Sequence, residues 1–334
     1  MRENRIKILV VIERLCLFAG FVLSIAFFVS CENSPRVKSE IHQSEMPIQW
    51  TRFELEFHGS ESSEIPLLKR EYPYLFPPKF SDSTWVKRQK DSLQLLLVDA
   101  VSEKFPSLDF LRDELKHLFQ HLKKEFPEIK PPHIITLVNN VDYQSKTVYA
   151  DSLLLISIDT YLGNTHKLYE GIPQYIRQEM DISYIYGHIL DKFLRSQLGE
   201  NQRRELLEVM IYEGKLQYLK TQLWPHYPDY TLMGYTPDQM NWALANERYI
   251  WQYFIEKELL YETHPSYLNR FIEPAPFSKF YLELDSESPG KIGVWLGWQM
   301  VNAFMDKYPE TSLKSLWRMP AQIVFQKSQY KPKK

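Results

Sequence analysis

Cysteine is almost absent from this 334-residue sequence, which contains only Cys16 and Cys31. Cys16 lies in a segment that we expect to be removed, so one cysteine would remain and no internal disulfide could form. The sequence also lacks a basic run, apart from the terminal "KPKK", and its formal net charge is −2. A nucleic-acid partner is therefore not expected.

The first 31 residues combine a basic front end with an apolar run, "LCLFAGFVLSIAFFV", at residues 15–29. This run is short for a membrane span but suits the core of a signal peptide. "FVSC", residues 28–31, resembles a bacterial lipobox, in which a small residue precedes a lipidated cysteine. We predict a signal peptide over residues 1–30, a covalent lipid on Cys31 and a polar tether over residues 31–50. The alternative is a single membrane anchor with an incidental cysteine.

Signatures of catalytic sites are also missing. There is no Gly-x-Ser-x-Gly motif, and the nine histidines are scattered without a His-x-His pair. Because Cys31 is expected to carry the lipid, no sequence motif marks a serine or a cysteine as a catalytic nucleophile. The sequence therefore predicts no cofactor.

Residues 51–334 have an even composition without repeats, which predicts one domain. Its front part, to about residue 171, mixes strands and helices, and the remainder is a helical body. The fold class expected is α+β, mostly helical, with a small N-terminal sheet. Strands are predicted within 51–59, 132–140 and 146–163. Helices are predicted over 81–105, 107–126, 181–198, 202–223, 236–260 and from residue 288 onward.

"ESPGKIGVWLGWQM", residues 287–300, is rich in glycine and tryptophan. Ser288 and Pro289 are typical of a helix start. Gly290, Gly293 and Gly297 would then share one helix face. Because glycine inside a helix costs about 1 kcal/mol relative to alanine, this stripe predicts a neighbour that packs very closely.

The composition of this stretch also suggests two other functions. A phosphate loop would need Ser or Thr after Lys291, where the sequence has isoleucine. A platform for sugars would need exposed tryptophans. Trp298 flanks the glycine face and is expected in the core, whereas Trp295 lies further round and is a candidate for stacking on a ligand, although packing is the more common role.

Several long segments carry a family resemblance. They are "MIYEGKLQYL", "GYTPDQMNWALANERYIWQYFIEKELLY", "FIEPAPFSKFYLELDSESPGKIGVWLGWQMV" and the ending "SQYKPKK". From roughly residue 50 onward the chain resembles the gliding-motility lipoprotein GldB family of the Bacteroidota. The resemblance implies a cell-envelope lipoprotein needed for gliding and associated with type IX protein secretion. It implies no chemical activity.

A fainter resemblance is to degenerate gluzincin metallopeptidases, which carry His-Glu-x-x-His on one helix and a ligating glutamate on a later one. The matching residues here are "HILDK", 188–192, and Glu213. His188 and Glu213 stand at ligand positions, but Ile189 replaces the general base and Lys192 the second ligand. Since catalytic zinc needs three protein ligands and an open position, no metal is expected, and zinc is the alternative. The expected arrangement is a buried Glu213 paired with a basic or hydroxyl group and a solvated His188.

The leading hypothesis is an envelope lipoprotein that acts without catalysis, through protein contacts, in gliding or type IX secretion. If the ancestral zinc has been lost, Lys192 is expected to lie beside Glu213 and supply the missing positive charge. The alternatives are a metal-dependent hydrolase and a module that binds peptides or glycans. The expected location is the periplasm-facing side of the outer membrane.

Overall fold

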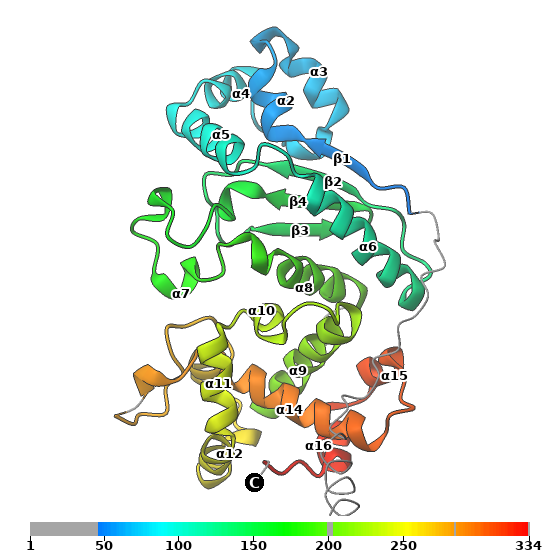
Figure 1. The fold of residues 1–334 in the computed structure, drawn as a ribbon, viewed down its shortest axis with the longest axis vertical. Helices are drawn as coiled ribbons and strands as arrows, with labels where there is room; N and C mark the ends of the chain where they lie inside the picture. Colours follow the sequence, from blue (N-terminus) through cyan, green and yellow to red (C-terminus); the bar gives the residue numbers. More distant parts are fainter. Residues whose placement is uncertain (1–45, 199–202, 284, 333–334) are drawn as a thin grey trace, which may run out of the picture. The chain divides into compact units, whose positions relative to one another are not determined.

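Four short strands form one mixed sheet in the computed structural model, which describes residues 46–198, 203–283 and 285–332 (Figure 1). The strands are β1 (Gln49–Arg52), β2 (His133–Leu137), β3 (Thr147–Ala150) and β4 (Leu153–Ser157), in the order β1-β2-β4-β3. β1 and β4 both run parallel to β2, and β3 pairs with β4 as a hairpin in which Tyr149 faces Leu154. The predicted signal peptide, Cys31 and nearly all of the tether lie outside the described residues.

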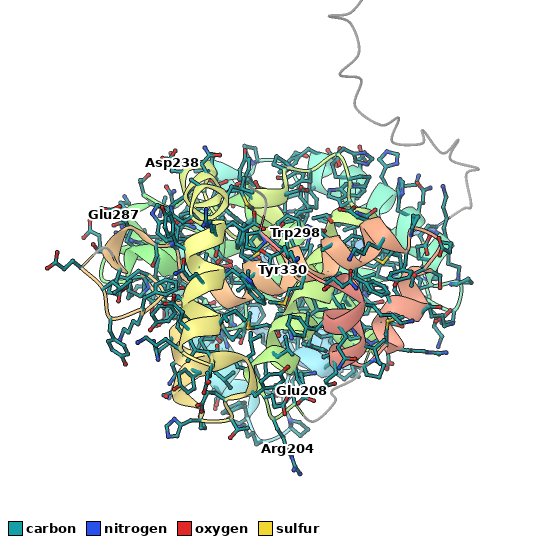
Figure 2. All side chains as sticks on the ribbon, turned by 90° about the horizontal axis from the view of Figure 1, so that it is seen from below. Arg204, Glu208, Asp238, Glu287, Trp298 and Tyr330 are labelled. Atoms are coloured by element: carbon teal, nitrogen blue, oxygen red, sulfur yellow. The ribbon has the colours of Figure 1, made fainter. Side chains whose placement is uncertain are left out.

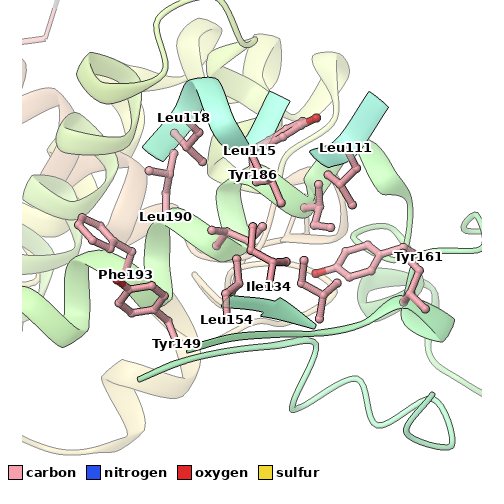
Figure 3. Close-up of a cluster of buried hydrophobic side chains, with 14 of the residues drawn as sticks. Leu111, Leu115, Leu118, Ile134, Tyr149, Leu154, Tyr161, Tyr186, Leu190 and Phe193 are labelled. Atoms are coloured by element: carbon pink, nitrogen blue, oxygen red, sulfur yellow. The ribbon is translucent and has the colours of Figure 1, made fainter. Parts of the chain in front are cut away.

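Both faces of the sheet are buried, which explains why β2 and β4 consist mostly of apolar residues. Alternate side chains of a strand point to opposite faces. Ile134 and Leu154 pack into a core with α5 (Ser92–Lys104), α6 (Asp109–Glu125) and α8 (Ile185–Leu198), and Figure 3 shows part of this core. Ile135 packs on the other face into a second core, with α2 (Phe53–Gly59), α3 (Ile65–Glu71) and α4 (Asp82–Gln89).

The strand predicted over 51–59 is wrong for residues 53–59, because only β1 is extended and α2 follows it directly. Phe53 and Phe57 are four residues apart and share the buried face of α2, whereas Leu55 is 40% exposed. The predicted helix over 81–105 is two helices. The first ends at Gln89, and Asp91 caps α5, since its carboxylate accepts hydrogen bonds from the backbone of Leu93 and Gln94.

The helical body follows the sheet, as predicted. It consists of α7 (Gln174–Arg177), α9 (Leu206–Leu223), α10 (Asp229–Met233), α11 (Pro237–Ala245), α12 (Glu247–Glu256), α13 (Ser266–Phe271), α14 (Ile292–Lys307), α15 (Leu313–Arg318) and α16 (Ala321–Ser328). The helix predicted over 236–260 is broken at Asn246. Trp298 and Tyr330 lie in the core of this body (Figure 2). The prediction of an α+β, mostly helical fold is confirmed.

α9 connects the two halves because opposite ends of the helix belong to different cores. Leu216 and Leu219 pack into the core beneath the sheet, and Leu207 and Met210 pack into the core of the helical body. α9 is therefore buried around most of its circumference.

Glycines permit a close crossing between α9 and α14. A Cβ added at Gly297 would lie 1.9 Å from the carbonyl oxygen of Met210, and one added at Gly214 would lie 2.3 Å from the carbonyl carbon of Gly297. Gly293 meets the carbonyl oxygen of Phe271 at 2.9 Å in the same way. No side chain larger than hydrogen fits between these backbones.

The prediction that Gly290 shares a helix face with Gly293 and Gly297 is wrong, because α14 begins only at Ile292. Gly290 lies before the helix, against the carbonyl oxygen of Ala275. Ser288 does not cap α14. It is buried, and its hydroxyl donates to the carbonyl oxygens of Ser278 and Asp285.

Candidate functional site

A polar cavity of about 470 Å³ lies between the sheet side and the helical body. Its walls come from the loop before β3, the loop before α8, the exposed side of α8, the middle of α9, α10 and the first residues of α14. Nine charged side chains line it: Lys146, Glu179, Asp191, Lys192, Arg195, Glu213, Lys220, Glu273 and Lys291. Such a density of charge distinguishes it from an apolar packing defect.

α8 supplies one row of these side chains. His188, Asp191 and Arg195 follow one another at helical spacing and face the cavity, while Ile189 and Phe193 on the opposite side are fully buried. The sequence of α8 is thus amphipathic, with its apolar stripe against the sheet and its polar stripe on the cavity.

Arg195 joins the two carboxylates of this row and of α9. Its Nε donates to Asp191 at 2.8 Å, and its Nη1 and Nη2 donate to the two oxygens of Glu213 at 3.0 and 2.7 Å. Burial would raise the pKa of Asp191, but Arg195 outweighs this effect and holds it below its usual value. The planar guanidinium suits this forked geometry better than an ammonium does.

Glu179 is the centre of a second network. One carboxylate oxygen accepts from Lys291 Nζ at 2.9 Å, and the other lies 2.9 Å from His188 Nε2. Burial would raise the pKa of Glu179, but the charge of Lys291 and the hydrogen bond from His188 hold it well below its usual range. Glu179 is therefore a carboxylate at neutral pH.

His188 lies between Glu179 and Tyr161, whose hydroxyl is 2.9 Å from Nδ1. Burial, followed by repulsion from Lys146, lowers the pKa of His188 to about 4. The neutral ring then donates through Nε2 to Glu179 and accepts at Nδ1 from Tyr161. Both ring nitrogens are used within the protein.

The Glu179–Lys291 pair needs two unusual backbone positions. Lys291 adopts a left-handed φ of 58°, which costs about 1 kcal/mol or more for a non-glycine residue. Gly234 has a φ of 79°, and a Cβ there would lie 2.6 Å from Glu179 Oε1. A side chain at residue 234 would therefore strain the backbone and displace Glu179 from its place beside Lys291.

Besides Lys192 at the rim, three lysines reach this cavity from different elements. Lys220 Nζ donates to the carbonyl oxygen of Leu232 at 2.8 Å, and Lys291 Nζ donates to that of Met233 at 3.1 Å. Within the described ranges, no hydrogen bond or ion pair engages the ammonium group of Lys146, whose backbone carbonyl accepts from Ser157. Burial lowers the pKa of both Lys146 and Lys220.

The structure brings His188 and Glu213 to the same cavity but not to each other. Glu213 binds Arg195, not Lys192, so the expected contact between Lys192 and Glu213 is wrong. Lys192 is exposed at the rim of the cavity. Arg195, about one turn further along α8, contacts Glu213 in its place. His188 is not solvated either, since its side chain is only 19% exposed.

The prediction that Trp295 could stack on a ligand is wrong. Its side chain is 0% exposed, so it cannot stack on a ligand from solvent. α14 is covered on nearly every side, and the face that a single-helix analysis leaves free is occupied by neighbouring helices.

Sequence reasoning missed Glu179, Lys291, Lys146 and Lys220. The first two precede helices in irregular segments, where no periodicity marks a functional residue. Lys220 had one available signal, because it lies seven residues after Glu213 on the same helix and therefore shares a helix face with it.

A zinc site does not fit these residues. No group of three or more His, Cys, Asp and Glu side chains is arranged to hold a metal ion in the part of the chain that the structure describes. His188 has both nitrogens engaged, and Arg195 occupies both oxygens of Glu213. A metal would have to displace these partners.

Fold and cavity together define an α+β protein, mostly helical, with a polar cavity whose charged groups are largely paired with one another. The profile of the family described as gliding motility protein GldB matches residues 34–332, and the chain belongs to this family. Membership implies a role in gliding motility, and the lipoprotein label of the family implies anchoring in the cell envelope. Comparisons with curated proteins and with solved structures gave no match. Across the described ranges, no helix is long and apolar enough to cross a membrane.

Proposed function

We propose that this chain contributes to gliding without catalysis, as a lipid-anchored body that binds other envelope components of the motility or type IX secretion machinery. Family membership supplies the role in gliding. The pairing of the side chains in the cavity supports the absence of catalysis. The proposed location is the periplasmic face of the outer membrane.

The observation that carries the proposal is the engagement of His188. A general base needs a free lone pair directed at the proton that it removes. Here the Nδ1 lone pair faces Tyr161, and Nε2 faces Glu179. Glu179 in turn is bound by Lys291, and Glu213 is bound through both oxygens by Arg195. The groups that a hydrolase would use are thus neutralised by neighbours, as in a structural polar network.

The experiment is complementation of a gliding strain that lacks the endogenous gene. In His188→Gln the glutamine amide can still form hydrogen bonds, but it cannot act as a proton shuttle or bind zinc well. We expect this variant to restore colony spreading and secretion of type IX cargo, provided that its level in the envelope matches the wild type. His264→Gln, at an exposed histidine outside the cavity, is the matched control.

Two results would overturn the proposal. One is a His188→Gln protein that is present at normal levels and folded but does not support spreading. The other is stoichiometric zinc in the purified wild-type lipoprotein together with hydrolysis of a peptide. Chemical crosslinking in the native envelope, compared between wild type and variant, would identify the contacts that the non-catalytic function requires.

A further inference from the structure

Tyrosine and arginine side chains gather on one surface of the helical body. Arg270, on α13, lies over the ring of Tyr281 at 4.5 Å and over the ring of Tyr267 at 5.2 Å, measured from Cζ to each ring centroid. Its Nη2 donates to the hydroxyl of Tyr253, on α12, at 3.0 Å. Tyr281 belongs to the loop between α13 and α14. We call these four residues, together with Leu282, the tyrosine–arginine surface.

Two members of this surface are large and exposed. Tyr281 is 76% exposed, and the adjacent Leu282 is 61% exposed. Single exposed apolar residues are common on proteins, but two neighbours of this size keep a continuous apolar area in contact with water. A partner that covers both side chains removes this area from water, which favours association.

The loop holds Tyr281 outward in a fixed conformation. Its backbone has a φ of 62°, which is an outlier for a bulky side chain. The carboxylate of Asp285 stabilises this turn, because it accepts from the backbone N–H of Tyr281 at 2.8 Å and of Leu282 at 3.2 Å. The preceding residue, Phe280, is buried against Phe271, with ring centroids 5.5 Å apart. A side chain that is already fixed loses less entropy on binding, and enforced backbone strain is typical of functional sites.

The rim of the tyrosine–arginine surface is acidic. Residues 272–290 carry a net charge of −3, because one lysine is set against four acidic residues, Glu273, Glu283, Asp285 and Glu287. Glu283 and Glu287 are exposed, and Figure 2 shows Glu287 at the periphery of the molecule. A partner that covers this surface therefore gains electrostatic complementarity by placing lysine or arginine opposite the rim.

A protein fits this surface better than a lipid bilayer or a glycan does. The anionic head groups of a bilayer repel the acidic rim. A glycan needs an open aromatic face and polar side chains around it, whereas Arg270 covers one face of Tyr281 and the neighbouring Leu282 has no polar side-chain atom. Tyrosine and arginine are also the residue types that most often dominate the binding energy of protein–protein interfaces.

We propose that the tyrosine–arginine surface is the docking site for an envelope protein that presents an apolar pocket bordered by lysine or arginine. Tyr281 is the anchor that enters the pocket, and Leu282 packs at its margin. Glu283 and Glu287 face the basic border. The assignment rests on the proposed function, because it names the surface through which a non-catalytic body binds its partner.

The test is photocrosslinking in living cells of a gliding strain in which the full chain replaces the endogenous protein. p-Benzoylphenylalanine is introduced in place of Tyr281 and, as the matched control, in place of Phe110, which is 49% exposed on α6. We expect a light-dependent adduct with one protein from position 281 and none from position 110. The crosslinked peptide of the partner should contain more lysine and arginine than aspartate and glutamate. No adduct at 281, an adduct only with lipid or glycan, or the same adduct from both positions would each overturn the proposal.

Charge reversal tests whether the adduct depends on the acidic rim. With the crosslinker kept at position 281, the double change Glu283→Lys and Glu287→Lys should lower the yield of the adduct at least fivefold, because it places like charges opposite the basic border. Glu103→Lys with Glu125→Lys, at exposed glutamates of α5 and α6, is the matched control and should leave the yield unchanged. An adduct whose yield stays the same or rises when the rim is reversed would refute the proposed partner.

Complementation connects the surface to gliding. Tyr281→Ala combined with Leu282→Ala should reduce colony spreading at least fivefold with an unchanged melting temperature and a normal level in the envelope, whereas Phe110→Ala should spread like the wild type. A folded double variant that spreads normally would refute the docking site but not the proposed function, since the body can bind through another surface. Failure of His188→Gln would instead refute the non-catalytic function and leave the crosslink at position 281 standing, so the two proposals fail separately.

Discussion

Replacement of Gly297 by alanine should destabilise the protein far more than one added methyl group normally does. The new Cβ would lie 1.9 Å from the carbonyl oxygen of Met210, on the backbone of α9. Ordinary contacts of a Cβ begin at 3.4 Å, so α9 and α14 would have to separate by about 1.5 Å at their crossing. A backbone oxygen inside a helix cannot rotate away as a side chain can.

The expected cost follows from two opposing terms. Overpacking of a core typically costs about 1–3 kcal/mol, and a clash with backbone belongs at the upper end or above it. Alanine recovers about 1 kcal/mol through its higher helix propensity. The net loss in the free energy of unfolding should therefore be about 2 kcal/mol or more. For a domain of this size such a loss lowers the melting temperature by roughly 4–8 °C.

Thermal unfolding of the purified lipoprotein, followed by circular dichroism at 222 nm, measures this change. Gly59→Ala is the matched control, because Gly59 also belongs to a helix but has no atom within 4 Å of its added Cβ. We expect this control to melt at or slightly above the wild-type temperature. A Gly297→Ala protein that melts with the control would show that the helices are not packed backbone to backbone, and the reasoning would be wrong.

Three further predictions concern the anchor and the cavity. Cys31→Ala should abolish labelling by radioactive palmitate, because Cys31 would be the only cysteine of the mature chain, and labelling that persists would exclude the predicted lipobox. The free energy of unfolding should fall as the pH drops from about 6.5 to about 4, because the unfolded chain binds a proton on His188 that the folded site excludes. The loss is at most about 3 kcal/mol. Chemical denaturation at several pH values measures it, and His188→Gln should make the free energy of unfolding depend less on pH over this range. Arg195→Met should lower the free energy of unfolding by about 1–3 kcal/mol, because it leaves the carboxylates of Asp191 and Glu213 without their cation. Adding Glu213→Gln to this variant should recover part of the loss. An Arg195→Met protein as stable as the wild type would contradict the pairing.

The sheet and most helices could be predicted because their signals are local. The apolar runs of β2 and β4 and the polar stripe of α8 each follow from one segment. Residues 53–59 were misassigned for the same reason. The apolar residues at 53, 55 and 57 alternate like a strand, but positions 53 and 57 also fit one face of a helix, and only packing against Ile135 decides between them.

The cavity was only partly predictable. His188 and Glu213 were identified because they match positions of a motif, and motifs are a property of the sequence. Their actual partners were not, since Arg195 reaches Glu213 from a different helix and Glu179 reaches His188 from an irregular loop. Trp295 was misjudged because a helical wheel shows one helix and not the neighbours that cover it.

The sequence by itself determined the α+β class, the glycines at 293 and 297 that allow a close crossing, the residues that resemble the GldB family and the expected lipid anchor. These follow from spacing and residue type, which are fixed along the chain. Only the tertiary structure decided which charges neutralise one another. That choice depends on how α8, α9, α10 and the residue before α14 approach in space, because the energy of a charge pair depends on distance and burial and not on separation in the sequence.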